Sequence, residues 1–200
     1  MQLHKPDVVD AAAAILDNYG IADLTMRRLA RELNVSPGAL YWHFANKQEL
    51  LGAVADRILR SAVVDVTGLG WRRAIQDSCA ALRDAVLSHT DGAELVSASF
   101  AAGQSATVVQ ILDQLAAAAA EAGAHGDDAD STARTLIYYV LGFTVDEQSR
   151  RQWDAAGALP DEQSVLMSDT DRQFAFGLSL LIDGLAVHGA AHDPATGTAN

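Results

Sequence analysis

The stretch from residue 24 to residue 47, LTMRRLARELNVSPGALYWHFANK, limits the possible folds more than any other part of the chain. Thr25 and Ser36 each stand directly before a short helical pattern, where a hydroxyl can accept a free backbone N–H. Pro37 follows at the first helical position, where its missing N–H costs nothing. Asn34 suits a left-handed turn between the two patterns. The sequence therefore predicts two short helices joined by a tight turn.

This arrangement is typical of helix-turn-helix DNA binding. A second helix this short can enter the major groove by its N-terminal end, where small residues let the backbone approach the base edges. Tyr41 and Lys47 can then hold phosphates, and Arg27 and Arg28 flank the same surface. The alternative is a three-helix subdomain with ordinary surface charges.

The same residues resemble a known family. The string LTMRRLARELNVSPGALYWHFANKQELL closely resembles the DNA-binding domain of the TetR (tetracycline repressor) family of bacterial regulators. LYWHFANK is the specific part, because tyrosine, tryptophan, histidine and lysine rarely coincide at these offsets. The likeness continues more weakly to about Leu185 and favours the tetracycline-repressor branch. It implies an N-terminal three-helix helix-turn-helix domain and a larger C-terminal helical domain for ligand binding and dimerisation.

The resemblance assigns DNA contacts to this stretch. Arg27 falls where the tetracycline repressor has a guanine-reading arginine, and bidentate pairing with guanine makes that role chemically sensible. The departure is SPGAL, where Pro37 replaces a glutamine-bearing sequence, so the operator should differ. In the alternative interpretation Trp42 and Phe44 are core residues, and for Phe44 we predict that role. The predicted DNA-binding residues are Thr25, Arg27, Arg28, Ser36, Pro37, Gly38, Ala39, Tyr41, Trp42, His43 and Lys47.

Composition and charge narrow the class of protein. Half of the residues are apolar, many of them alanine, and only 6% are aromatic, which favours helices over strands. The net charge is −12, but residues 1–60 hold seven basic and seven acidic residues, so the excess lies in residues 61–200. A neutral N-terminal part on an acidic body fits a local set of DNA contacts. It argues against a histone-like, non-specific binder.

Several other classes of protein and site are not indicated. No apolar run is long enough to span a membrane and MQLHKPDVVD is not a signal peptide, so we expect a cytoplasmic protein with no membrane partner. The single cysteine, Cys79, makes no disulfide framework or zinc site and is expected to be an inert core residue. Without a phosphate loop, a G-x-S-x-G elbow or clustered Cys and His, we predict no metal, no cofactor and no enzyme activity.

The remaining chain has helical periodicity and no alternating strand pattern, so we predict an all-α fold. Asn46 and Glu49 fit a capping box at the start of a linking helix. Further helices are expected over residues 6–19, 71–86, 93–101, 107–122, 131–155 and 171–189, with loops at 123–130 and 156–170, the second one mobile. The predicted domains are a DNA-binding domain (1–46), a linking helix (47–66), a ligand-binding and dimerisation domain (67–189) and a disordered tail (190–200).

The C-terminal part resembles the tetracycline repressor without its metal-binding chemistry. HTDGAELVSASF is similar to the pocket-lining segment, yet Val96 stands where the metal-binding histidine would be. A hard divalent ion needs oxygen or imidazole ligands, which valine lacks. We expect no magnesium–tetracycline site but an apolar cavity for a hydrophobic or aromatic small molecule, with a filled core as the alternative. The predicted ligand-binding residues are Val63, Ser78, Leu82, Val96, Ser99, Ile111 and Asp146.

The last two helices carry apolar stripes together with Gly142, Gly177 and Gly184, which suits close helix packing. These stripes could face the subunit's own core, but the resemblance implies a homodimer that binds a pseudo-palindromic DNA operator. It further implies a repressor released when a small-molecule effector makes the linking helix swing. The rival hypotheses are a DNA-binding regulator without small-molecule sensing and an all-α enzyme or interaction module whose motif is idle.

Overall fold

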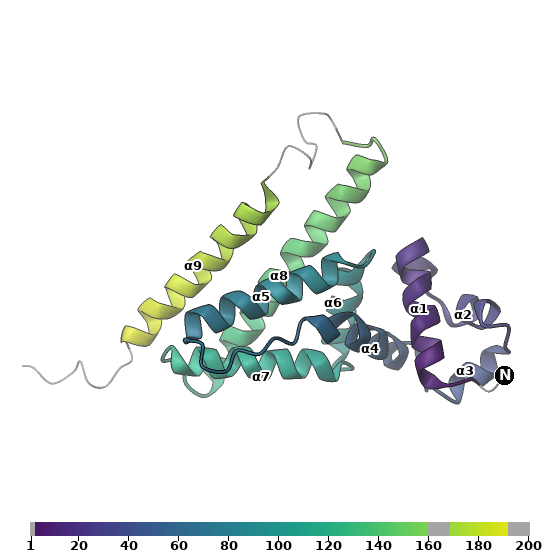
Figure 1. Ribbon diagram of the computed structural model, residues 1–200, viewed down its shortest axis with the longest axis horizontal. Coiled ribbons are helices and arrows are strands. Elements are labelled where there is room, and N and C mark those ends of the chain that lie inside the picture. The colour runs from purple at the N-terminus through teal and green to yellow at the C-terminus, as the bar shows by residue number, and fades with distance from the viewer. Residues whose placement is uncertain (1–2, 160–168, 192–200) are drawn as a thin grey trace, which may run out of the picture.

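The computed structural model describes residues 3–159 and 169–191, and no strand occurs among them. The prediction of an all-α fold is confirmed. Three helices, α1 (Lys5–Tyr19), α2 (Met26–Glu32) and α3 (Pro37–Tyr41), form a small head at one end of the molecule (Figure 1). Helix α4 (Lys47–Ile58) leads from the head into a larger helical body.

Five helices of the described residues belong to the body. Helices α5 (Trp71–Leu87), α6 (Gly92–Ala102) and α7 (Ala106–Glu121) surround the C-terminal end of α4, and the long helices α8 (Asp127–Ala155) and α9 (Thr170–Ala191) lie side by side along them (Figure 1). The core runs without interruption from the head into the body. Movement of one part is therefore coupled to the packing of the other.

The head has its own set of buried side chains. Leu16 of α1, Leu29 of α2 and Leu40 of α3 are fully buried, and so is Phe44 between α3 and α4 in the chain. The predicted core role of Phe44 is confirmed. Trp42, which the alternative interpretation also placed in the core, is instead exposed.

Helix α4 attaches to the body by close backbone contact. A Cβ atom on Gly52 would lie 2.1 Å from the carbonyl oxygen of Gln104, so only glycine lets α4 approach the α6–α7 corner this closely. Asp56 of α4 accepts hydrogen bonds from the Ser105 hydroxyl (2.6 Å) and the Thr107 backbone N–H (2.9 Å) at the start of α7. The position of α4 is thus tied to that corner.

Two helix ends differ from the sequence-based expectation. The linking helix was expected to reach residue 66, but α4 ends at Ile58 and a single 3₁₀ turn continues to Ser61. The β-branched Val63 and Val64 are weak helix formers, and the Val64 carbonyl accepts a hydrogen bond from Gln114 of α7 instead of continuing the helix. Helix α8 starts at Asp127, within the expected 123–130 loop, because three acidic residues in its first turn favour the positive end of the helix dipole.

The start of α4 and the end of α9 also differ in part from the expectation. Asn46 caps α4 as predicted, but Glu49 accepts a hydrogen bond from the Ala45 N–H (2.8 Å) and does not close the reciprocal bond to Asn46. Residue 190, expected to begin a disordered tail, still belongs to α9. The rest of that tail and most of the expected mobile loop, residues 192–200 and 160–168, lie outside the described residues.

Candidate DNA-binding surface and effector-binding cluster

Helix α2 begins at the predicted cap. The Thr25 hydroxyl accepts a hydrogen bond from the Arg28 backbone N–H at 3.1 Å, which fixes the first turn of the helix. Arg27 is exposed, and within the described part of the chain it makes no ion pair. Its guanidinium is therefore available to a partner outside the chain, as a base-reading arginine must be.

Arg28, which was also predicted to contact DNA, has partners within the head. Its guanidinium pairs with Asp23 at 2.7 Å and lies 3.8 Å from the centre of the Tyr19 ring. A cation held between a carboxylate and an aromatic face is already well satisfied. In this structure Arg28 braces the end of α1, because the 3₁₀ turn at Ile21–Asp23 brings both partners to it.

The turn between α2 and α3 follows the predicted chemistry. Asn34 adopts a left-handed conformation with φ 52°, and the Ser36 hydroxyl accepts a hydrogen bond from the Ala39 N–H at 3.3 Å. Pro37 occupies the first helical position, and Gly38 and Ala39 follow on the surface. The start of α3 consequently presents only small side chains, which leaves its backbone open to a close partner.

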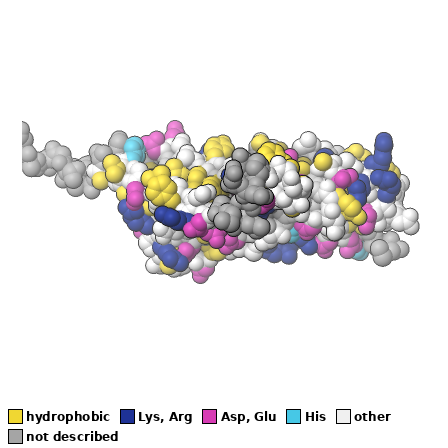
Figure 2. All heavy atoms as spheres, turned by 90° about the horizontal axis from the view of Figure 1, so that it is seen from above, with side chains coloured by type: hydrophobic (Ala, Val, Ile, Leu, Met, Phe, Trp, Pro, Cys, Tyr) yellow, Lys and Arg dark blue, Asp and Glu magenta, His cyan; other side chains and the backbone are white. Residues whose placement is uncertain are grey.

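The other end of α3 presents aromatic side chains to solvent. Tyr41 is 53% exposed and Trp42 is 90% exposed, although both belong to residue types that usually lose most of their surface on folding. His43 and Lys47 are half-buried nearby, on either side of the turn into α4. The head end also carries Lys and Arg side chains on the face shown in Figure 2. Exposed aromatic and basic groups beside a small-residue helix start make a surface suited to a nucleic acid.

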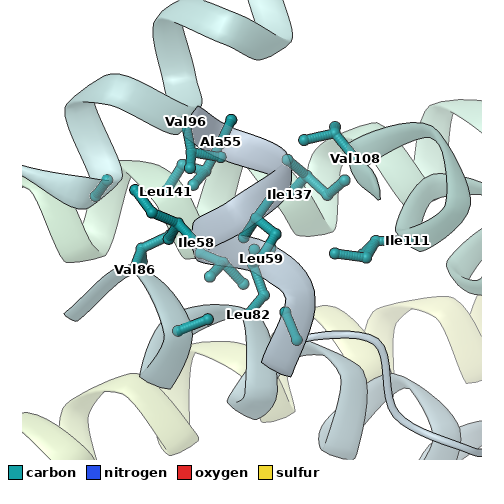
Figure 3. Close-up of a cluster of buried hydrophobic side chains, with 14 of the residues drawn as sticks. Ala55, Ile58, Leu59, Leu82, Val86, Val96, Val108, Ile111, Ile137 and Leu141 are labelled. Carbon is teal, nitrogen blue, oxygen red and sulfur yellow. The ribbon is translucent and has the colours of Figure 1, made fainter. Parts of the chain in front are cut away.

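Three of the predicted effector-binding residues line an apolar cluster in the body. They are Leu82 of α5, Val96 of α6 and Ile111 of α7 (Figure 3). The remaining members of this lining are Val108, Ile137 and Leu141. About 180 Å³ of non-atom space lies between these side chains, but none of it admits a water-sized sphere. The cluster is closed in this structure, as the filled-core alternative expects.

Two buried hydroxyls on the body differ in their bonding. The Ser78 hydroxyl accepts a hydrogen bond from Gln114 at 3.1 Å. The Ser99 hydroxyl on α6 is fully buried and has no hydrogen-bond partner among the described residues. Such a group loses its hydration without compensation, which makes it a natural anchor for a polar atom of a ligand.

The lining of this cluster does not include the other four predicted ligand-binding residues, Ser78, Ser99, Val63 and Asp146. Val63 is half-buried beside an open groove of α1, α4 and α7. Asp146 is exposed on α8 and does not line the cluster in this chain. The inward face of α8 passes through Thr144 to Glu147 and Gln148, so residue 146 points away from the interior.

The buried charge on α8 is Glu147, which sequence reasoning missed. Its carboxylate pairs with Arg83 of α5 at 2.9 Å, and the side chains are only 1% and 8% exposed. Burial alone would lower the pKa of Arg83, but hydrogen bonds and charges from Asp171 and Glu147 outweigh it and raise that pKa. Both residues continue the apolar stripes of their helices, and this periodicity could have predicted their burial. Arg83 also pairs with Asp171 of α9 at 2.8 Å, so these charges join α5, α8 and α9.

Cys79 lies in the middle of α5 and is fully buried. Burial raises the pKa of its thiol to about 12, so the reactive thiolate is absent near neutral pH. Among residues 3–159 and 169–191, no three His, Cys, Asp or Glu side chains come together in a group that could hold a metal ion.

Comparisons with known proteins agree with this geometry. Residues 8–54 match the family described as bacterial regulatory proteins, tetR family, and residues 67–188 match the tetracyclin repressor-like C-terminal domain. Tetracycline repressor protein class E of Escherichia coli is 31% identical over 200 residues, which cover 92% of each chain.

Solved structures show a greater similarity. The crystal structure of Mycobacterium smegmatis BioQ is 69% identical, with a TM-score of 0.88, and the match covers 94% of this chain and 100% of that one. A crystal structure of BioQ with its natural double-stranded DNA operator is 66% identical over 92% of this chain and 99% of that one, with a TM-score of 0.82.

Proposed function

The chain belongs to the TetR family of bacterial regulatory proteins, and on that basis we propose that it is a homodimeric transcriptional repressor that binds a pseudo-palindromic operator. The outer surface of the head, formed by Arg27 and residues 36–43, reads the bases. Thr25 and Lys47 hold phosphates at its edges. The single observation that supports this reading most strongly is the 90% exposure of Trp42 on a short helix whose start is otherwise lined by small residues.

The similarity to BioQ supports the same proposal. BioQ has been crystallised with its double-stranded DNA operator and is 66% identical to this chain over nearly its whole length. Its relatives are regulators, and we propose no catalytic role for this chain and a cytoplasmic location, where an operator would be accessible. The division into a head of residues 1–46, a linking segment of 47–66 and a body of 67–189 belongs to this proposal.

Dimerisation is proposed to use the outer faces of α8 and α9. Tyr138 of α8 and Phe176, Leu180 and Val187 of α9 are exposed large apolar side chains on these two helices. Hydrophobic side chains lie along this part of the surface in Figure 2. Helix α9 is long and apolar enough to cross a membrane by length and composition, but a second copy of the chain covers such a face equally well. Two heads are then available for two half-sites.

The effector is proposed to be a hydrophobic or aromatic small molecule that opens the cluster around Val96 and Ile111. Because the cluster has no room for a water molecule in this structure, the effector binds a state in which α6 has moved. The buried hydroxyl of Ser99 gives that state one polar contact. The closed cluster also favours the rival function, a DNA-binding regulator without small-molecule sensing.

A selection experiment tests DNA reading. Purified protein is incubated with a random duplex pool at about 150 mM salt, at which non-specific phosphate binding is weakened, and the bound DNA is sequenced. We expect two inverted half-sites at a fixed separation. Recovery of no shared sequence would contradict the operator-binding proposal and favour a helix-turn-helix that does not read DNA.

A thermal-shift screen with apolar and aromatic compounds tests sensing. A true effector raises the melting temperature by mass action and weakens binding to the selected operator. Compounds that raise the melting temperature without changing operator affinity would support the regulator that does not sense small molecules.

A further inference from the structure

The α5–α6 turn holds the head to the body at a place separate from α4. The two ends of α6 contact different parts of the chain. Just after its C-terminal end, Gln104 contacts Gly52 of α4, and just before its N-terminal end, the side chain of Asp91 bonds to Ile21, which follows α1 in the head. The contact at Asp91 reaches the head without passing through α4.

The Asp91 carboxylate accepts hydrogen bonds from both the head and α8. Its Oδ2 atom accepts a hydrogen bond from the Ile21 backbone N–H at 2.9 Å, and its Oδ1 atom accepts one from Gln152 of α8 at 2.5 Å. Gly20, directly before Ile21, has φ 80°, and a Cβ atom there would lie 2.6 Å from Asp91 Oδ2. The end of α1 is therefore shaped to receive this carboxylate.

This use of Asp91 differs from what its position predicts. An aspartate directly before a helix normally accepts a hydrogen bond from the second or third helical N–H. Asp91 makes no such bond to α6. The amide oxygen of Gln148 on α8 accepts the Ala93 N–H at 3.1 Å instead. Because α8 supplies the cap of α6, the Asp91 carboxylate is free to bind the head.

Neighbouring contacts strengthen the same junction. His89 Nδ1 lies 2.9 Å from the Asp17 carboxylate, and the Thr90 hydroxyl donates to the Asp17 carbonyl at 2.9 Å. Gln148 also donates to the carbonyl of His89 at 2.8 Å, which ties the turn to α8. A continuous set of hydrogen bonds consequently runs from α8 through the α5–α6 turn to the end of α1.

We propose that Asp91 is a positioning residue for operator recognition, fixing the orientation of the head relative to α8. This inference rests on the proposed function, in which α8 takes part in the dimer surface and two heads bind two half-sites. With α8 fixed by the dimer, a bond from α8 to α1 sets the distance between the heads. Half-site separation is a geometric property of such a dimer, so Asp91 controls which separation the protein accepts.

The test measures how operator affinity depends on half-site separation. Full-length wild type and Asp91→Ala are titrated with the selected operator, with derivatives whose half-sites are moved by one and two base pairs, and with a duplex carrying one half-site. For the wild type we expect a sharp optimum. For Asp91→Ala we expect roughly tenfold weaker binding at the optimum, the equivalent of about 1.4 kcal/mol, with a flattened dependence on separation. Affinity for the single half-site and the dimer measured by sedimentation should be unchanged.

Three further variants isolate the role of the carboxylate. Glu94→Ala removes the same charge from the first turn of α6 at an exposed side chain that does not contact the head, and it should behave as wild type. Asp91→Asn keeps an oxygen for the Ile21 N–H and should restore most of the optimum. Gln152→Ala removes only the bond from α8, at an exposed residue that should not affect folding, and should flatten the dependence less than Asp91→Ala does.

The outcomes separate this inference from the proposed function. If Asp91→Ala and Gln152→Ala keep the wild-type optimum, with only a lower melting temperature or a uniform loss of affinity, the positioning role is wrong and operator binding stands. If Asp91→Ala does not fold, Gln152→Ala decides alone. A wild type with no preferred separation and no shared half-site overturns the proposed function itself.

Discussion

In the head, the side chains proposed to bind DNA point into solvent, whereas in the body the side chains proposed to bind an effector point into a packed interior. Trp42 is almost fully exposed although it is one of the largest apolar residues in the chain. Ser99 is fully buried although its hydroxyl has no partner among the described residues. Each region therefore departs from ordinary burial rules, and the two departures are of opposite kinds.

The difference shows what each region needs for its proposed activity. The head needs an outside partner to cover surface that is already in place, so its binding requires little rearrangement. The body needs a partner that replaces contacts already made within the chain, so an effector must compete with the apolar packing around Ile111. We expect substitutions in the head to change affinity with little change in stability, and substitutions in the body to do the reverse.

The largest expected effect is a loss of stability when the buried ion pair of the body is broken. Arg83→Met leaves Glu147 buried with only the partly exposed Arg151 as a partner. Loss of one member of a buried ion pair typically costs about 3–5 kcal/mol, so we expect the free energy of unfolding measured in urea to fall by about 3 kcal/mol. The double variant Arg83→Met/Glu147→Leu should recover most of that loss. If the single variant were as stable as the wild type, the pair would not hold the body together.

A smaller effect is expected in the head. Arg27→Ala should weaken binding to the selected operator by about 1–3 kcal/mol, roughly fivefold to 150-fold, and relax the preference at one base pair. Because Arg27 is exposed, the melting temperature should stay within a degree or so of wild type. The matched control is Arg150→Ala, an equally exposed arginine on the body. Equal losses in the two variants, measured by fluorescence anisotropy, would mean that the effect is only one of net charge.

A weaker effect is expected at Ser99, whose buried hydroxyl has no hydrogen-bond partner among the described residues. Ser99→Ala removes a buried polar atom without a partner, so we expect the closed protein to gain up to about 1 kcal/mol of stability in urea. The same change should reduce the response to any effector found by thermal shift. Ser97→Ala, which removes a hydroxyl bonded to the Ala93 carbonyl on the same helix, is the control. Marked destabilisation by Ser99→Ala would indicate that its hydroxyl has a partner in solution.

The smallest expected effect is an absence of reaction. At pH 8 Cys79 should react with an aromatic disulfide reagent only after unfolding, because burial raises the pKa of its thiol to about 12 and excludes the reagent. Ser88→Cys, at an exposed position just after the same helix, should react at once and verify the assay. Rapid reaction of Cys79 in the folded wild type would show that the body opens easily.

The sequence predicts the head better than the body because the head depends on neighbours along the chain. Thr25, Ser36 and Asn34 act within three residues of their own positions, so their types and spacing were sufficient. The contacts of Arg28 with Tyr19 and Asp23 were not predicted, because they depend on how the chain turns at the end of α1. A five-residue helix is also too short for periodicity to tell whether Trp42 points inward.

In the body, the decisive contacts join residues far apart in the chain. The Arg83–Glu147 pair spans 64 residues and the bond from Asp91 to Ile21 spans 70. Helical periodicity places Arg83 and Glu147 on inward stripes, but only the fold shows that they meet. The resemblance singled out Asp146, whereas the register of α8 buries its neighbour Glu147.

The exposure of Trp42 gives the protein an optical probe of its own. The chain has three tryptophans, and Trp71 and Trp153 lie in the body, away from the surface proposed to meet DNA. An indole in water emits at long wavelength, and stacking against a nucleic acid quenches it. Fluorescence of the unlabelled protein should therefore report whether DNA is bound to the head. In a Trp42→Phe variant only Trp71 and Trp153 would emit, so changes in the body could be followed separately.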